Sequence, residues 1–257
     1  TEQIDNGKKR LEKKIKNGKY IAYFQNNTNT FLPPDRFRSY LMEATRIPGV
    51  VEISVSTRPD CVSAEYLDIM RDIRAMTGIQ MNVELGLQTA NYHTLQMIDR
   101  GHGLAEFIDA VLRIKSYTGI SICTHVILNL PGDTASDAKE TARILTALGV
   151  DIVKLHSLYI ARNTRLCDWY ENGKITVCSK EEYFERVITF LEQIPETVAV
   201  ERMFSRIPEK DAVFCNWGCS WWRLRDELLQ KMEEEGRYQG RCCDYLNGAA
   251  LRLLKSE

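Results

Sequence analysis

The sequence predicts an α/β fold in which a parallel sheet forms part of a barrel. Short apolar or β-branched segments alternate with helical segments over the first 160 residues, and strands separated by helices form parallel sheets through right-handed crossovers. Several of these strands are apolar on both faces, as expected when helices cover one side and a filled barrel interior the other. The length of 257 residues suits one α/β barrel.

The elements are expected in the following order. A helix over 2–17 ends at Gly18, and the apolar segment 19–25 is the first strand. Further strands, each an apolar or β-branched run, are expected at 50–57, 81–88, 119–130 and 151–160, with a weaker sixth at 197–204. Further helices, from their apolar spacing, are expected at 34–47, 63–78, 91–99, 103–118, 134–149, 180–193, 219–235 and 241–254. With no repeat or linker, we predict one domain over 1–257, with barrel elements in about 19–166 and a C-terminal helical extension in about 167–257.

Composition excludes several function classes. The net charge of −1 gives no broad basic surface for nucleic acid or membrane, and the basic cluster at 8–16 fits the solvated face of a helix. No apolar run approaches the ~20 residues that span a bilayer, and the start lacks a signal-peptide core. Eight cysteines without such a signal favour the reducing cytoplasm over a disulfide scaffold.

Polar side chains gather where the predicted strands end, which is where α/β proteins bind ligands. All five strands contribute, directly or through the turn or helix that follows. The candidates for a ligand site are Gln25, Asn27, Thr28, Arg58, Glu84, Gln88, Arg100, His125, Asn129, Pro131, Gly132, Lys154, His156 and Tyr159.

Each candidate alone has a simpler explanation. Glu84 could be a buried acid paired with Lys154 or Arg58, and His125 and His156 could be ordinary core histidines. These explanations do not account for polar groups at the same end of five strands.

Two turn segments also have simpler explanations. Thr134, in the PGDT segment 131–134, could cap the next helix. Arg100 and Gly101 suit the C-terminus of a helix, where a cation and a glycine are both favoured.

Two longer segments resemble a known family. ELGLQTANYHTLQMIDRGH (84–102), followed by THVILNLPGDT (124–134), resembles the radical SAM superfamily, and most closely the group with the Elongator catalytic subunit and the coproporphyrinogen dehydrogenases. YFQNNTNTF (23–31), STRPDC (56–61) and VKLHSLYIARNTRL (153–166) narrow the resemblance to YhcC-like radical SAM proteins.

The resemblance implies a partial (β/α)6 TIM-like barrel that holds S-adenosylmethionine and a four-iron, four-sulfur (4Fe-4S) cluster. In the family, three cysteines spaced C-x3-C-x2-C after the first strand bind the cluster. An electron, supplied by a donor such as flavodoxin or ferredoxin, releases a 5′-deoxyadenosyl radical, which abstracts hydrogen from an as yet unidentified substrate. The implied activity is that of an iron–sulfur oxidoreductase.

The resemblance also implies roles for the candidates. Glu84 and Gln88 stand where relatives contact the ribose and methionine part of the cofactor. Residues 25–28 replace a Gly-Gly-Glu motif that binds its amino group, and residues 129–132 match a turn along the adenine. Tyr159 would be a neighbour of the adenine, and Arg100 a partner for a carboxylate.

The sequence departs from the family at the cluster motif. C-x3-C-x2-C does not occur, and Cys215-x3-Cys219 is followed by Trp222 at the third position. Because helix 2–17 matches the helix after the cluster loop, the first strand and that loop would precede Thr1, and this chain alone is expected to be inactive. The alternative is a cluster-free nucleotide-binding or scaffolding module. A phosphate-binding barrel enzyme would need a late glycine-rich loop, which the sequence lacks.

Four late cysteines form a separate candidate metal site. Cys215, Cys219, Cys242 and Cys243 could hold an auxiliary cluster or zinc. The adjacent pair 242–243 suits a closed four-ligand site poorly, so buried thiols are the simpler expectation.

Loss of the family's first strand would also leave the strand at 19–25 at a sheet edge. Exposed edges pair with other chains. We therefore expect either a dimer through this edge or its coverage by the N-terminal helix, through Ile4, Leu11 and Ile15.

Overall fold

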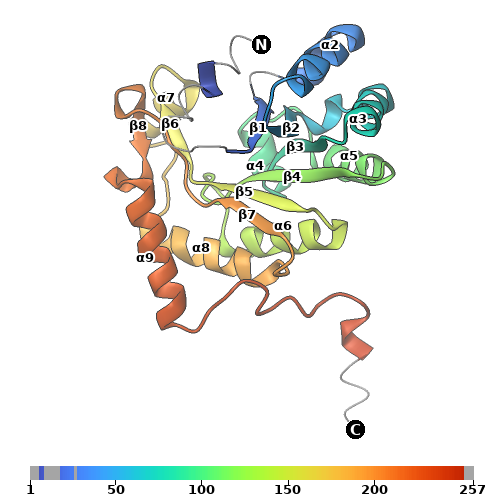
Figure 1. The fold of residues 1–257 in the computed structure, drawn as a ribbon. Coiled ribbons are helices and arrows are strands. Elements are labelled where there is room, and N and C mark those ends of the chain that lie inside the picture. The colour runs from blue at the N-terminus through green and yellow to red at the C-terminus, as the bar shows by residue number, and fades with distance from the viewer. Residues whose placement is uncertain (1–5, 9–17, 26–27, 252–257) are drawn as a thin grey trace. The chain divides into compact units, whose positions relative to one another are not determined.

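Figure 1 shows a computed structural model of the chain, which describes residues 6–8, 18–25 and 28–251. The strands are β1 (Tyr20–Phe24), β2 (Val50–Thr57), β3 (Gln80–Gln88), β4 (Ile120–Ile127), β5 (Ile152–His156), β6 (Tyr159–Ala161), β7 (Ala199–Arg202) and β8 (Ala212–Cys215). The helices are α2 (Pro34–Thr45), α3 (Ala64–Thr77), α4 (Tyr92–Met97), α5 (Leu104–Lys115), α6 (Ala135–Leu148), α7 (Arg165–Glu171), α8 (Lys180–Gln193) and α9 (Trp221–Glu234). Most of the predicted helix 2–17, including Ile4, Leu11 and Ile15, lies outside the described residues.

Six strands form one sheet in the order β1-β2-β3-β4-β5-β7. β1 pairs in parallel with β2, β2 with β3, and β5 with β7. The predicted α/β class and the weaker sixth strand are confirmed. Among the described strands β1 lies at an edge of this sheet, as expected.

The chain divides into two compact units, the first formed by residues 1–86 and 104–124 and the second by residues 87–103 and 125–257. In the first unit, α2 packs on α3 and β2. α3 ends at Gly78, whose φ of 72° is left-handed and favours glycine. The fully buried core side chains of the first unit include Phe37, Leu41, Ile53, Leu67, Ile73, Met81 and Leu85.

In the second unit, α6 packs on α8. The side chain of Thr134 accepts from the N–H of Asp137, and the Asp137 carboxylate accepts from the N–H of Thr134, which makes a capping box at the start of α6. The expected capping role of Thr134 is therefore confirmed. Tyr183 and Phe190 of α8 are fully buried.

The prediction of one strand over 151–160 is wrong. β5 ends at His156 and β6 begins at Tyr159 in a second sheet, antiparallel to β8. Residues 157 and 158, which separate β5 from β6, are hydrogen-bonded to two asparagine side chains. Asn216 Oδ1 accepts from Ser157 Oγ, and Asn129 Oδ1 accepts from Leu158 N at 2.5 Å. β8 and α7 were not predicted.

The predicted helix at 241–254 is also wrong for residues 241–248, which are not helical. The backbone N–H of Cys242 donates to Glu192 O at 2.8 Å, and Tyr245 Oη donates to Gln193 O at 2.8 Å. These bonds hold the segment in an irregular path along the end of α8.

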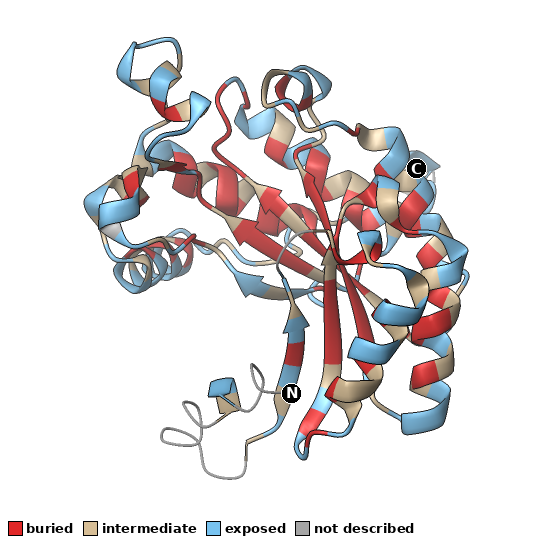
Figure 2. Ribbon diagram, turned by 90° about the horizontal axis from the view of Figure 1, so that it is seen from above, coloured by how far each residue is buried: buried red, intermediate tan, exposed pale blue. Residues whose placement is uncertain are grey.

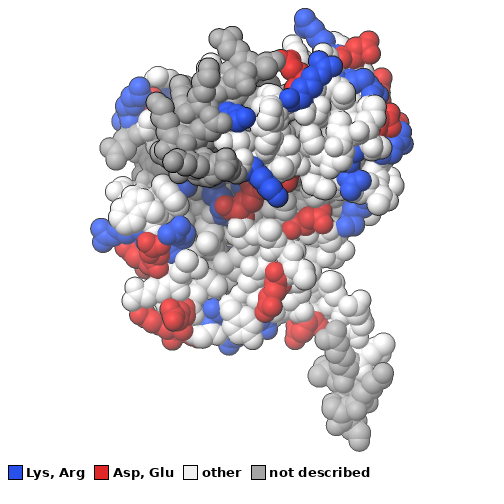
Figure 3. Space-filling model, viewed as in Figure 1, with Lys and Arg blue, Asp and Glu red and all other residues white. Residues whose placement is uncertain are grey.

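Burial follows the strands, which are largely red in Figure 2, whereas helices show exposed residues on their outer faces. Acidic and basic side chains are interspersed on the face drawn in Figure 3, in keeping with the net charge of −1. Within the described part of the chain, no helix has the length and apolar character needed to cross a membrane.

Candidate functional site

The carboxylate of Glu84 is buried in the first unit and receives two side-chain hydrogen bonds. Tyr23 Oη donates to its Oε2 at 2.8 Å and Ser54 Oγ donates to its Oε1 at 2.7 Å. Glu84 is 2% exposed. Each carboxylate oxygen therefore has a donor, which offsets part of the cost of burying a charge.

These contacts belong to a polar network that crosses four strands. Asn82 Nδ2 donates to Ser54 Oγ at 2.9 Å, and Ser121 Oγ donates to Asn82 Oδ1 at 3.2 Å. Tyr23 lies opposite Ser54, and Ser54 opposite Asn82, in the strand registers. Since Asn82 and Glu84 are two residues apart on β3, their side chains share a face. The sequence analysis singled out only Glu84 of this set.

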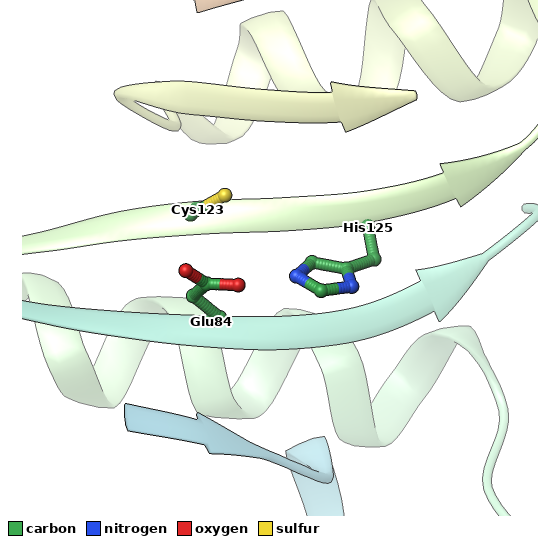
Figure 4. Close-up of side chains that lie close together, drawn as sticks. All are labelled: Glu84, Cys123 and His125. Atoms are coloured by element: carbon green, nitrogen blue, oxygen red, sulfur yellow. The ribbon is translucent and has the colours of Figure 1, made fainter. Parts of the chain in front are cut away.

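Figure 4 shows Glu84 on β3 together with Cys123 and His125 on β4. Cys123 is fully buried, and strand alternation puts His125, two residues further along β4, on the same face. One carboxylate oxygen, the thiol sulfur and one ring nitrogen lie within 4.8 Å of one another. Within the described part of the chain this is the one group of three such ligands.

Gln88, the last residue of β3, and Asp133, in the turn after β4, both belong to the second unit. Gln88 has a φ of 75°, a left-handed conformation that costs energy for a side chain other than glycine. Asp133 is buried and accepts from Thr94 Oγ1 at 2.5 Å. Burial raises the pKa of Asp133, although hydrogen bonds from Thr94 and Thr89 oppose the shift in pKa. These bonds tie the segment after β3 to the turn after β4.

Asn129 is buried and carries a donor without a partner. Its Oδ1 accepts from Leu158 N, whereas its Nδ2 has no hydrogen-bond partner among the described residues. Pro131 is buried and Gly132 is exposed with a φ of 90°. The turn after β4 therefore offers an amide donor beside a glycine.

The candidates on β5 have partners within the second unit. Lys154 Nζ lies 2.8 Å from Glu201 Oε2, and the Lys154 side chain is 8% exposed. His156 Nδ1 lies 3.4 Å from Ser205 Oγ. The rings of His156 and His125 are 5.2 Å apart, so the structure brings these two predicted residues together.

Other candidates lie at the surface or at a helix end. Arg58 donates twice to the Asp60 carboxylate, at 2.9 and 2.6 Å. Gln25 and Tyr159 are exposed and Thr28 is half-buried.

Arg100 follows α4, and its backbone N–H donates to Leu95 O at 3.0 Å. Gly101 after it has a φ of 74°. This agrees with the simpler explanation of a helix C-terminus. Asn27 lies outside the described residues.

All eight cysteines lie in the described part of the chain and none is in a disulfide. The late candidates Cys215, Cys219, Cys242 and Cys243 do not come together as a group of three ligands. Burial raises the pKa of the Cys215 and Cys178 thiols. The four late cysteines are half-buried, so the expectation of buried thiols is wrong for them.

A cleft of about 690 Å³ lies in the second unit, lined by residues 205–208 and 212–221. The guanidinium of Arg206 lies 3.5 Å from the ring centre of Trp221. Trp217 has a φ of 51°, and its Nε1 donates to Cys178 O at 2.8 Å. The sequence analysis did not predict this cleft.

Comparisons with known proteins agree with the fold. Residues 1–145 match the Radical SAM superfamily and residues 150–234 match the Radical_SAM C-terminal domain. Protein YtqA of Bacillus subtilis is 33% identical over 239 residues, 93% of this chain and 73% of that protein. Protein YhcC of Escherichia coli K12 is 30% identical over 218 residues, 85% of this chain and 70% of that protein.

Among solved structures, the archaeal Methanocaldococcus infernus Elp3 with an N-terminus deletion superposes with a TM-score of 0.74 at 21% identity. The match covers 90% of this chain and 58% of that one, so it supports the fold. The family match spans more than half of this chain, and the relatives at 30% identity or more cover most of it. The chain belongs to the radical SAM superfamily and is similar to YhcC-like members.

Proposed function

We propose that this chain is the S-adenosylmethionine-binding core of a radical SAM enzyme. The observation that carries the proposal is the family match over residues 1–145, which contain β1 to β4 and the segments after them. S-adenosylmethionine, when bound, supplies the 5′-deoxyadenosyl radical that abstracts hydrogen from substrate. The residues of this chain would bind and orient it.

The described residues fit this cofactor in chemical type. The buried Nδ2 of Asn129, which has no partner among the described residues, can donate to a ring nitrogen of adenine. Gly132 leaves room for a ligand, since an added Cβ would meet no atom closer than Thr94 Oγ1 at 3.6 Å. Gln88 offers both an amide donor and an acceptor to ribose hydroxyls.

The cysteines do not fit a 4Fe-4S cluster. The sequence contains no C-x3-C-x2-C, and no three thiols come together among the described residues. We therefore assign no step to a cluster held by this chain, and propose that residues outside these 257 provide its ligands. A flavodoxin- or ferredoxin-type protein is the proposed electron donor.

A second candidate function is a cluster-free nucleotide-binding module of the same fold, and the missing cysteine motif is the observation that favours it. Both functions need the adenosyl site. They differ in whether the cysteine motif accompanies this chain in the functional protein. Iron analysis of the natural protein, purified without oxygen, separates the two functions. Only the radical enzyme should contain four irons per chain, bound by residues outside these 257.

The adenosyl site is tested by calorimetric titration with S-adenosylmethionine and S-adenosylhomocysteine. We expect saturable binding of both by the wild type. Gln88→Ala and Asn129→Ala should each weaken binding about tenfold, the equivalent of one lost hydrogen bond of about 1.4 kcal/mol. The matched control is Gln96→Ala, since Gln96 is exposed on α4.

The outcomes are separable. A wild type that shows no saturable binding would overturn the proposed function. A wild type that binds both ligands, with both variants binding equally well, would leave the function in place and show that Gln88 and Asn129 are not contacts.

A further inference from the structure

The cleft lined by residues 205–208 and 212–221, from here on the 205–221 cleft, has the size and walls of a small-molecule site. Its volume of about 690 Å³ falls within the range of roughly 300–1,000 Å³ that such sites occupy. Ile207, Phe214 and Trp217 contribute apolar surface to its walls. All of the lining residues belong to the second unit. The cleft can therefore enclose an apolar or aromatic body.

Buried hydrogen bonds hold the two stretches of the cleft wall together. Asn216 Nδ2 donates to Ser205 O at 2.9 Å, and Asn216 Oδ1 accepts from Ser157 Oγ at 2.6 Å. Ser205 N donates to the same Ser157 Oγ at 2.9 Å. These three residues are at most 4% exposed. Asn216 and Trp217 have φ values of 50° and 51°, a left-handed conformation that their surroundings must maintain. A wall fixed in this way is preorganised, which lowers the entropic cost of binding a ligand.

Arg206 is the one charged side chain among the described residues that line the cleft. Its guanidinium carbon lies 3.5 Å from the centre of the Trp221 ring, so the face of the ring holds the planar group in place. Arg225 also lies over this ring, at 5.7 Å, but it donates to the carboxylate of Asp226. Within the described part of the chain Arg206 has no such carboxylate partner. Its N–H donors are therefore available to a ligand.

The charge of the cleft selects the sign of the ligand. No aspartate or glutamate is among the described lining residues. α9 begins at Trp221 in the cleft wall and has no acidic residue in its first turn, so the partial positive charge of its N-terminus adds to that of Arg206. A guanidinium presents paired donors that match the two oxygens of a carboxylate or phosphate. An anion attached to an apolar body fits both the charge and the walls.

We propose that the 205–221 cleft binds a small organic anion, a carboxylate or a phosphate monoester on an apolar or aromatic body, with Arg206 as the contact to the anion. Trp221 is the positioning residue that holds Arg206. The site goes beyond the proposed function, because it lies in the segment 150–234 that matches the Radical_SAM C-terminal domain. It contains none of the residues proposed to contact S-adenosylmethionine.

The test is saturation-transfer NMR of the 257-residue chain with three probes that share one ring: phenyl phosphate, phenylacetate and the neutral phenylacetamide. Titration gives the Kd of each probe. We expect saturable binding of at least one aromatic anion, about 10- to 100-fold tighter than that of phenylacetamide, as a hydrogen bond to a charged group provides. The tighter of the two anions identifies the preferred oxyanion. Inorganic phosphate, which lacks the ring, should bind more weakly than phenyl phosphate.

Variants assign the contact. Arg206→Gln should weaken binding of the anions about 10- to 100-fold and leave that of phenylacetamide unchanged, a split that a merely structural role would not produce. Arg206→Lys should keep the preference for anions, because it keeps the charge. The matched control is Arg165→Gln, since Arg165 is exposed in the same unit and its guanidinium lies 4.5 Å from the centre of the Trp169 ring, outside the cleft. Trp221→Leu should weaken binding of the anions, whereas Trp222→Leu, at an exposed position outside the lining, should not.

Three results would overturn the proposal. The first is a wild type that is folded by circular dichroism and binds neither aromatic anion saturably. The second is binding of phenylacetamide or inorganic phosphate as tight as that of the aromatic anions. The third is an Arg206→Gln variant that binds the anions as the wild type does, or an Arg165→Gln control that loses as much affinity as Arg206→Gln.

Discussion

Replacing Ser54 by alanine should destabilise the chain by about 3 kcal/mol, because one hydroxyl holds two buried groups. Ser54 Oγ donates to Glu84 Oε1 at 2.7 Å and accepts from Asn82 Nδ2 at 2.9 Å. All three residues are at most 2% exposed. Alanine fits the site without a clash, so the loss is of hydrogen bonds rather than of packing.

The magnitude follows from the two groups that lose a hydrogen-bond partner, the carboxylate of Glu84 and the side-chain amide of Asn82. A hydrogen bond to a charged group contributes about 1.5–3 kcal/mol, and a buried donor left without a partner costs about 1–3 kcal/mol. The two costs are not strictly additive, since Asn82 also contacts Ser121 and can reorient. A value of about 3 kcal/mol lies within the combined range.

Urea unfolding followed by circular dichroism measures the change in the free energy of unfolding. The slope of this free energy against urea concentration should be unchanged if the unfolded state is unaffected. The matched control is Ser116→Ala in the same unit, where an exposed hydroxyl donates to Arg113 O at 2.7 Å. The control should lose less than about 0.5 kcal/mol, as surface substitutions do. A Ser54→Ala variant as stable as the control would show that the network does not stabilise the fold.

Two further stability predictions follow from single contacts. Arg237 donates to both oxygens of Glu192, at 3.1 and 2.9 Å, and holds the pKa of Glu192 below its ordinary value of 4.5. That stabilisation is present above about pH 4.5 and is lost as the pH falls through the lower folded-state pKa. Urea unfolding of Glu192→Gln should therefore show a deficit against wild type that is largest at neutral pH and closes in acid; a constant deficit would contradict this. Gly119→Ala and Gly78→Ala should each cost about 1–3 kcal/mol in thermal unfolding, because φ is left-handed at both glycines. The Cβ added at Gly119 also meets the guanidinium of Arg74, but this is the end of a flexible side chain and can shift, so a much larger loss at Gly119 than at Gly78 would contradict this reasoning.

Local patterns predicted most of the sheet because each barrel strand carries its own signal. β1, β2 and β4 lie within the segments predicted from apolar runs, and β3 begins one residue before its predicted segment. The break between β5 and β6 has no such local signal. It depends on Asn129 and Asn216, which are far apart in sequence and bond to residues 157 and 158. A local pattern contains no information about partners of this kind.

The predicted helix at 241–254 failed for a related reason. Its apolar spacing suits a helix, but the backbone N–H groups of Gly240 and Cys242 find acceptors at Leu191 and Glu192, at the end of α8. Satisfying these donors against another element competes with satisfying them inside a helix. Tertiary contacts decided the outcome.

The site was predictable in part. An acid in the middle of a buried strand stands out, so Glu84 was singled out, but the neighbours that hold it were not. The sequence signal for these neighbours is a pair of polar or thiol residues two positions apart in an otherwise apolar strand. Such pairs are Asn82 and Glu84 on β3, and Ser121 and Cys123 on β4. Residues two positions apart in a strand share a face. The register that joins Ser54 and Tyr23 to them comes from the fold.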